Sequence, residues 1–192
     1  MARSKVRLTG SHGILSLLIV LLIFAVKLYL AHRTDSASAP PPSSHTVTLG
    51  NIAARSKTAG CQINGALPDG ACTPGAAISS ATASQICVSG YSSGVRNVTE
   101  TEKQAVFAEY GIAQHAAGEY EVDHYISLEL GGSNDISNLW PEAARPTPGF
   151  HEKDAVENWL HEQVCSGKLN LPAAQLDVIS DWTVMYRQIS GS

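Results

Sequence analysis

The chain has 192 residues, enough for one modest domain with appended segments. Its 13 Lys and Arg and 17 Asp and Glu are unevenly placed: residues 1–39 hold five of the basic residues and one acid, so the remainder is formally −8. Affinity for nucleic acids rests largely on Lys and Arg that neutralise phosphates, so this balance argues against a broad, tightly binding DNA surface.

The N-terminus predicts a membrane segment. Residues 1–13 are basic, and residues 14–31 are predominantly apolar; Lys27, the one charged residue among them, can reach the far interface. A helix of about 18 residues spans roughly 27 Å, enough to cross a bilayer. We predict a transmembrane signal-anchor over 14–31, with the basic segment cytoplasmic and the domain extracytoplasmic. A secreted form stays open as the alternative, although the cleavage-like site Ala37-Ser38-Ala39 lies far from the apolar run and precedes Pro40.

A Ser/Ala/Pro-rich linker is predicted over 32–60, followed by a domain over 61–192. The domain contains four cysteines: Cys61, Cys72, Cys87 and Cys165. Four cysteines in an exported segment suggest two disulfides, and three pairings are open. We predict Cys61–Cys72 and Cys87–Cys165. Zinc ligation is the rival interpretation, but no Cys-x-x-Cys occurs.

Several elements can be predicted along the domain. A short strand is predicted over 86–91, and the capping box of Thr99 and Glu102 predicts a helix to about Tyr110. Thr99 also completes a formal glycosylation sequon, but capping explains it better. Two later helices are predicted, from about 150 to 164 and from a cap at Asn170 to about 187. Their predicted inner faces are Ala155, Val156, Trp159, Leu160 and Gln163 or Val164 in the first, and Leu176, Ile179, Val184 and Met185 in the second.

The densest pattern lies between residues 120 and 151. Residues 120–130 alternate as in a strand, and Gly131-Gly132 then break the alternation, which predicts a hairpin whose loop contains 133–137. Asp123-His124, Gly131-Gly132, Asn138-Leu139 and His151 follow in that order. This order resembles the HNH (His-Me finger, ββα-metal) endonuclease motif. More loosely, segments 72–76, 95–96 and 164–167 resemble a group of bacterial exported HNH-like proteins.

The resemblance implies an α+β fold: a ββα-metal motif with flanking helices and disulfide-pinned loops, after the N-terminal membrane helix. It implies Asp123 and His151 as ligands of one divalent metal ion, Mg²⁺ first, with Mn²⁺, Ni²⁺ or Zn²⁺ as alternatives. His124 would be the general base, and Asn138 would bond the loop backbone and hold the His124 ring. Asp154 is a candidate for an outer-shell role. The activity implied is hydrolysis of phosphodiester bonds in DNA or RNA outside the cytoplasm.

Two departures from the family pattern leave alternatives open. The connection from Asn138 to His151 is longer than in the commonest members, and Ala155 stands where a second helical ligand is often found. The cysteine pairs that often brace the motif with structural zinc are absent. A catalytically silent HNH-like binding module, with a protein partner that the sequence does not identify, is therefore one alternative. A hydrolase of a small phosphodiester is the other.

Overall fold

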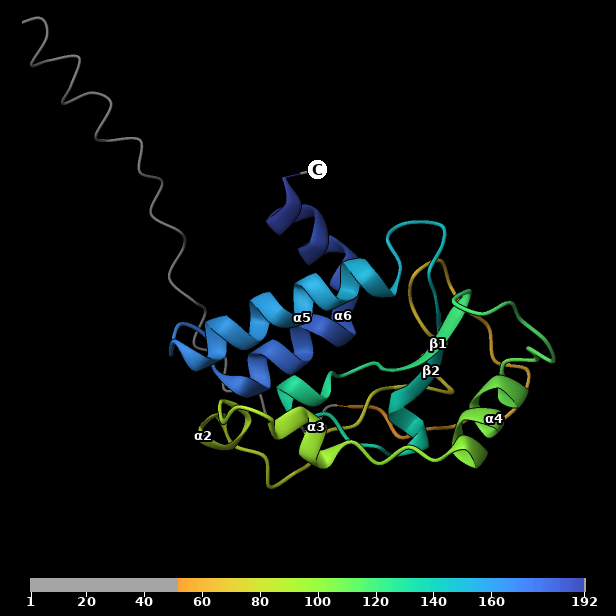
Figure 1. Ribbon diagram of the computed structural model, residues 1–192, viewed down its shortest axis with the longest axis horizontal. Helices are drawn as coiled ribbons and strands as arrows, with labels where there is room; N and C mark the ends of the chain where they lie inside the picture. Colours follow the sequence, from red (N-terminus) through yellow and green to blue (C-terminus); the bar gives the residue numbers. More distant parts are fainter. Residues whose placement is uncertain (1–51, 192) are drawn as a thin grey trace, which may run out of the picture. The chain divides into compact units, whose positions relative to one another are not determined.

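The computed structural model describes residues 52–191 of the chain. The predicted segments 1–13 and 14–31, and most of the linker over 32–60, lie outside these residues. Within 52–191 no helix is long and apolar enough to cross a membrane. The described part mixes helices with a small two-stranded sheet (Figure 1). In chain order its elements are α2 (Ala83–Ile86), α3 (Tyr91–Val95), α4 (Glu100–Glu109), β1 (Tyr120–His124), η2 (Leu128–Leu130), η3 (Ile136–Asn138), β2 (Leu139–Ala143), α5 (Phe150–Cys165) and α6 (Leu171–Ser190).

The predicted hairpin is confirmed. Strands β1 and β2 pair antiparallel, with Asp123 opposite Trp140 and His124 opposite Leu139. The first strand ends at His124, several residues before the predicted end, because Ser127 caps the 3₁₀ turn η2. Helix α4, which begins at the predicted Thr99 capping box, packs against both strands. The Asp-His pair therefore sits where the sheet ends and the loop begins.

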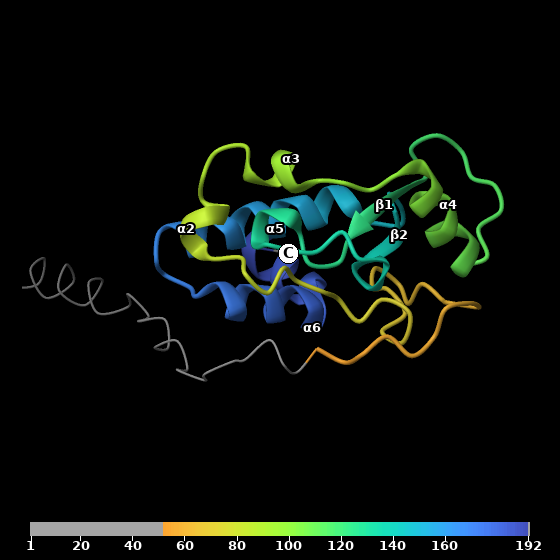
Figure 2. The same ribbon diagram turned by 90° about the horizontal axis from the view of Figure 1, so that it is seen from below.

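Helices α5 and α6 lie side by side in both views (Figures 1 and 2). Both were predicted near these bounds, and Asn170 caps α6 as expected. The predicted inner faces are wrong in part, because Ala155, Trp159 and Val184 are exposed. The buried positions of α5 are instead Phe150, Lys153, Val156, Glu157, Leu160 and Val164. Those of α6 are Leu171, Ala174, Gln175, Val178 and Trp182, and the helix kinks at Asp181.

Both predicted disulfides are confirmed. Cys61–Cys72 joins Cα atoms 6.0 Å apart, and Cys87–Cys165 joins Cα atoms 5.6 Å apart. The second links the C-cap of α2 to the last residue of α5. The predicted strand over 86–91 is wrong, because this segment is the end of α2 and the turn into α3. Upstream of Cys61, Arg55 already belongs to the packed unit through its ion pair with Glu109.

The glycine pair after η2 is required by close packing inside the loop. Gly131 has φ +74°, the left-handed conformation that favours glycine. At Gly132 an added Cβ would lie 1.8 Å from the carbonyl oxygen of Ile126. These contacts are internal to the protein, so the pair explains the course of the loop that carries Asn134 and Asn138.

We predict that Gly132→Ala lowers the free energy of unfolding by about 3 kcal/mol or more, because a backbone carbonyl cannot move aside as a flexible side chain can. Urea denaturation followed by circular dichroism measures this. Gly70→Ala is the control, since an added Cβ there meets nothing within 4 Å. Equal stability of both variants would contradict this packing.

Candidate active site between β1 and α5

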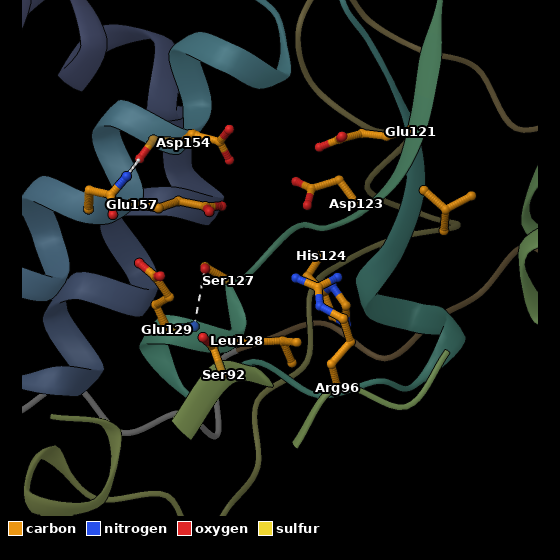
Figure 3. Close-up of a pocket in the computed structure, with 12 residues that line it drawn as sticks. Ser92, Arg96, Glu121, Asp123, His124, Ser127, Leu128, Glu129, Asp154 and Glu157 are labelled. Atoms are coloured by element: carbon orange, nitrogen blue, oxygen red, sulfur yellow. Dashed lines mark hydrogen bonds between the residues drawn. The ribbon is translucent and has the colours of Figure 1, made fainter. Parts of the chain in front are cut away.

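A cavity of about 230 Å³ lies between the end of β1, the first half of α5 and the segment of α3 that faces them (Figure 3). Carboxylates of β1 and α5 point toward one another across it. A larger hollow elsewhere, of about 840 Å³, is more apolar and holds no histidine. The smaller cavity is therefore the better candidate for chemistry. Its lining residues are Ser92, Arg96, Glu121, Val122, Asp123, His124, Ser127, Leu128, Glu129, Asp154, Glu157 and Asn158.

A buried lysine binds two of the carboxylates that line this cavity. Lys153 of α5 is 1% exposed, and its Nζ donates to Asp123 Oδ2 at 2.5 Å and to the His124 carbonyl at 2.9 Å. It also donates to Glu157 one turn along the helix, and Glu142 lies 3.9 Å away. One ammonium thus ties α5 to the end of β1, and Asp123 already has an internal cation as partner.

The buried ionisable groups around Lys153 have pKa values shifted from their usual ranges. Burial would lower the pKa of Lys153, but the charges of Asp123, Glu157 and Glu142 raise it well above its usual range. For Asp123, burial favours the neutral acid, but the adjacent ammonium outweighs it and holds the pKa below its usual value. Burial raises the pKa of Glu142 well above its usual value. Asp123 is therefore the anionic partner of Lys153.

The carboxylates around the open part of the cavity disfavour one another's charge. Burial, and then the charges of Asp123 and Asp154, raise the pKa of Glu121 to about 7. Burial and the charge of Asp123 also raise the pKa of Asp154. Burial raises the pKa of Glu157 to about 7. Binding of a cation stabilises a cluster of this kind, because the cation offsets the repulsion between the carboxylates.

His124 is the cavity's histidine, and its side chain is 1% exposed. Its Nε2 lies 3.1 Å from Oδ1 of Asn134, and its Nδ1 is buried with no hydrogen-bond partner among residues 52–191. Burial lowers the pKa of His124, as does the positive charge of Arg96 nearby, against the opposing effect of Asp123. The ring is therefore neutral at pH 7, the form in which a histidine can accept a proton.

Asn138, predicted to bond the loop and hold the His124 ring, bonds to the loop backbone. Its Oδ1 accepts from the N–H groups of Ile126 and Ala76, at 2.9 and 3.1 Å. Its Nδ2 donates to the carbonyls of Ile126 and Ser133, at 3.0 and 2.8 Å. The side chain is fully buried and makes four backbone hydrogen bonds. The side chain within hydrogen-bond distance of the His124 ring is that of Asn134 instead, through its Oδ1.

The structure places the other predicted site residues as follows. His151 is exposed on the first turn of α5, outside the cavity wall, but near enough for its charge to lower the pKa of Glu121 and Asp154. Asp154 lines the cavity. Among residues 52–191, the one group of at least three His, Cys, Asp or Glu with ligand atoms all within 4.8 Å is Cys87, His161 and Cys165. Two of its atoms form the disulfide, so this group could hold a metal only after reduction.

Residue-by-residue reading of the sequence missed Lys153, Glu157, Glu121, Arg96 and Asn134. One signal was present for the first two. Lys153 and Glu157 lie four residues apart in phase with Phe150, Leu160 and Val164, so two charged residues stand on the buried face of a helix. A charge at such a position is almost never buried without a partner. Asn134 carried no comparable signal, since asparagine is common in loops.

We predict that Lys153→Met lowers the free energy of unfolding by about 3–5 kcal/mol, because it leaves the buried Asp123 and Glu157 without their cation. Lys103→Met is the control: its ion pair with Glu100 is exposed and contributes below about 0.5 kcal/mol. Chemical denaturation of both variants provides the measurement. A loss no larger than that of the control would show that Lys153 does not hold α5 to β1.

Comparison with protein-family models, curated proteins and solved structures found no match to this chain. A function for this chain is therefore proposed from the geometry of the cavity.

Proposed function

We propose that the chain is a metal-dependent HNH-type endonuclease that hydrolyses phosphodiester bonds in DNA or RNA at the cavity between β1 and α5. The observation that carries the proposal is a neutral, buried His124 with an unpartnered Nδ1, lining the same cavity as the carboxylates of Glu121, Asp123 and Asp154. The order of the hairpin and α5, with the Asp-His pair at the end of β1, supports a ββα-metal arrangement.

The donors in the cavity fit a hard divalent cation such as Mg²⁺ or Mn²⁺. Such ions prefer carboxylate oxygens, and Glu121, Asp123 and Asp154 present them from two facing elements (Figure 3). Lys153 donates to one oxygen of Asp123, Oδ2. His151, the second ligand predicted from the sequence, stands near Glu121 and Asp154. A bound cation would neutralise charge on the phosphoryl oxygens and on the leaving oxygen.

The chain's own residues would supply the remaining chemistry. His124 takes a proton from the attacking water, which its neutral ring can accept. Arg96, the one Lys or Arg of the cavity wall, faces the phosphate and offsets part of the negative charge of the carboxylates. Without a cation the cavity would repel a polyanion, so cleavage should require the metal.

The site of action follows from the N-terminal segment. With the predicted anchor over 14–31, the domain would act outside the cytoplasm, tethered to the membrane or secreted after cleavage. Its substrate would then be environmental or incoming DNA or RNA. The −8 balance beyond residue 39 fits a substrate gripped at the cavity through the cation and Arg96 rather than over a wide basic face.

A catalytically silent binding module is the second candidate, and one observation favours it. Lys153 already supplies a cation to Asp123. No group of three ligand residues at this cavity has all its ligand atoms within 4.8 Å, as far as residues 52–191 are concerned. In that case the acidic cavity would recognise a cationic group of a partner. Metal-dependent cleavage distinguishes the two candidates.

We predict that His124→Ala reduces metal-dependent nicking of plasmid DNA, or degradation of RNA, by roughly 10²–10⁴-fold, since the proton acceptor is removed. Cleavage is measured with the full chain at low salt with Mg²⁺ or Mn²⁺ against EDTA. His115→Ala is the control, because His115 is exposed and stacks on Phe107 outside the cavity. Equal activity of wild type and His124→Ala would rule out His124 as the base.

Cation binding gives a separate prediction. Glu121→Gln and Asp154→Asn should each weaken Mn²⁺ binding by at least about tenfold in calorimetry, because each removes one carboxylate charge. His151→Ala tests the ligand that the sequence predicts, and a similar loss would place it in the coordination shell. Glu100→Gln, on the exposed face of α4, should leave binding unchanged. Unchanged binding in both cavity variants would remove the carboxylates as the cation site.

A further inference from the structure

Asn134 touches three parts of the site at once. Its Oδ1 lies 3.1 Å from Nε2 of His124 and accepts from the backbone N–H of Asn97 at 3.1 Å. Its Nδ2 donates to the carbonyl of Val95 at 2.8 Å. One half-buried side chain therefore joins the loop of the hairpin, the histidine of β1 and the two backbone groups that flank Arg96.

The two backbone bonds fix which way the amide of Asn134 points. A backbone N–H can only donate, and a carbonyl can only accept, so the oxygen must face Asn97 and the nitrogen must face Val95. The atom next to the His124 ring is then an oxygen, which can only accept. Nε2 must consequently carry the hydrogen, and in the neutral ring Nδ1 carries the lone pair.

This assignment agrees with an independent observation. Nδ1 has no hydrogen-bond partner within the described part of the chain, whereas nearly all buried polar atoms have one. Nδ1 is thus the ring nitrogen that has no protein partner among the described residues, and a lone pair there is what a proton acceptor requires. The geometry of Asn134 thus selects the ring nitrogen that can act as the base.

The same side chain also places Arg96. Arg96 is exposed and lines the cavity, and its guanidinium makes no hydrogen bond or ion pair within residues 52–191. Its backbone is held on both sides, because Asn134 bonds to the residue before it and to the residue after it. An unpaired guanidinium on a fixed backbone is suited to bind a phosphate oxygen.

We propose that Asn134 is a positioning residue that holds His124 as the Nε2–H tautomer and fixes the Arg96 segment against the cavity. Its benefit for phosphodiester cleavage rests on the proposed function, but the tautomer itself does not. Asn134 would act through His124 on kcat and through Arg96 on KM. The sequence predicted that Asn138 would hold the His124 ring, whereas the residue within hydrogen-bond distance of that ring is Asn134.

The test is ¹⁵N NMR on the full chain with ¹⁵N-labelled histidine, at a pH where the ring is neutral. His124 is identified by the signal that is lost in His124→Gln. Wild type should show a proton on Nε2 alone. Asn134→Ala should add a form protonated on Nδ1, since the acceptor is gone. Asn134→Asp should keep the proton on Nε2, because a carboxylate also accepts. Asn64→Ala, in an exposed loop, is the matched control.

Kinetics on the same proteins separate the two roles. Asn134→Ala should lower kcat by roughly 10–100-fold, whereas Asn134→Asp should recover most of kcat but retain a raised KM, because it cannot donate to Val95. A wild-type ring protonated on Nδ1, or an Asn134→Ala ring still protonated on Nε2 alone, would overturn the proposal. The expected tautomers without cleavage would support Asn134 and contradict the nuclease instead. If Asn134→Ala fails to fold, a proton on Nδ1 in Asn134→Asp would overturn the proposal equally.

Discussion

The ammonium of Lys153 is the interaction on which the site depends. It is fully buried, it joins α5 to the end of β1, and it fixes both the Asp123 carboxylate and the carbonyl of His124. A buried charge of this kind is tolerated only when its partners satisfy it, and here Glu157 and the nearby Glu142 complete the shell. The same contacts hold the Asp-His pair against the helix that forms the opposite wall of the cavity. The ammonium of Lys153 therefore both stabilises the fold and fixes the geometry of the site.

The cavity combines several carboxylates with one positively charged side chain, that of Arg96. Burial raises the pKa of Glu121 to about 7, so this carboxyl is poised between the charged and the neutral state near neutral pH. A cation would favour the charged state and allow a phosphate to approach. The arrangement would allow the proposed nucleic-acid substrate to bind a domain with an excess of acids, since the attraction would be confined to the cavity. It also accounts for the loop glycines, whose role is to pack the loop that presents Asn134 and Asn138.

Local sequence patterns predicted most of the secondary-structure elements of the fold. The Thr99 capping box, the alternation before Gly131 and the Asn170 cap predicted α4, the hairpin and α6, because each depends on neighbours in the chain. The predicted pairing of Cys87 with Cys165 is confirmed. The helix faces were harder to predict, since Trp159 and Val184 are apolar yet exposed, and Lys153 is charged yet buried. Only tertiary contacts decide such positions.

The sequence predicted individual residues of the site but not the hydrogen bonds and ion pairs between them. Asp123 and His124 line one cavity, but the partners that define their chemistry, Lys153 and Asn134, are 30 and 10 residues away in the chain. Sequence spacing contains no information on such contacts. Asn138 illustrates the limit: it stands where the motif places it, and all four bonds of its side chain go to the backbone of loops.

The central claim is that this cavity holds a divalent cation beside a neutral His124. Crystals soaked in Mn²⁺ and measured at the manganese absorption edge test it most directly. The account predicts an anomalous peak between β1 and α5, at roughly 2.0–2.3 Å from a carboxylate oxygen of Glu121, Asp123 or Asp154. An empty cavity in crystals that hold Mn²⁺ elsewhere, with Lys153 still bound to Asp123, would contradict the account and favour a binding module.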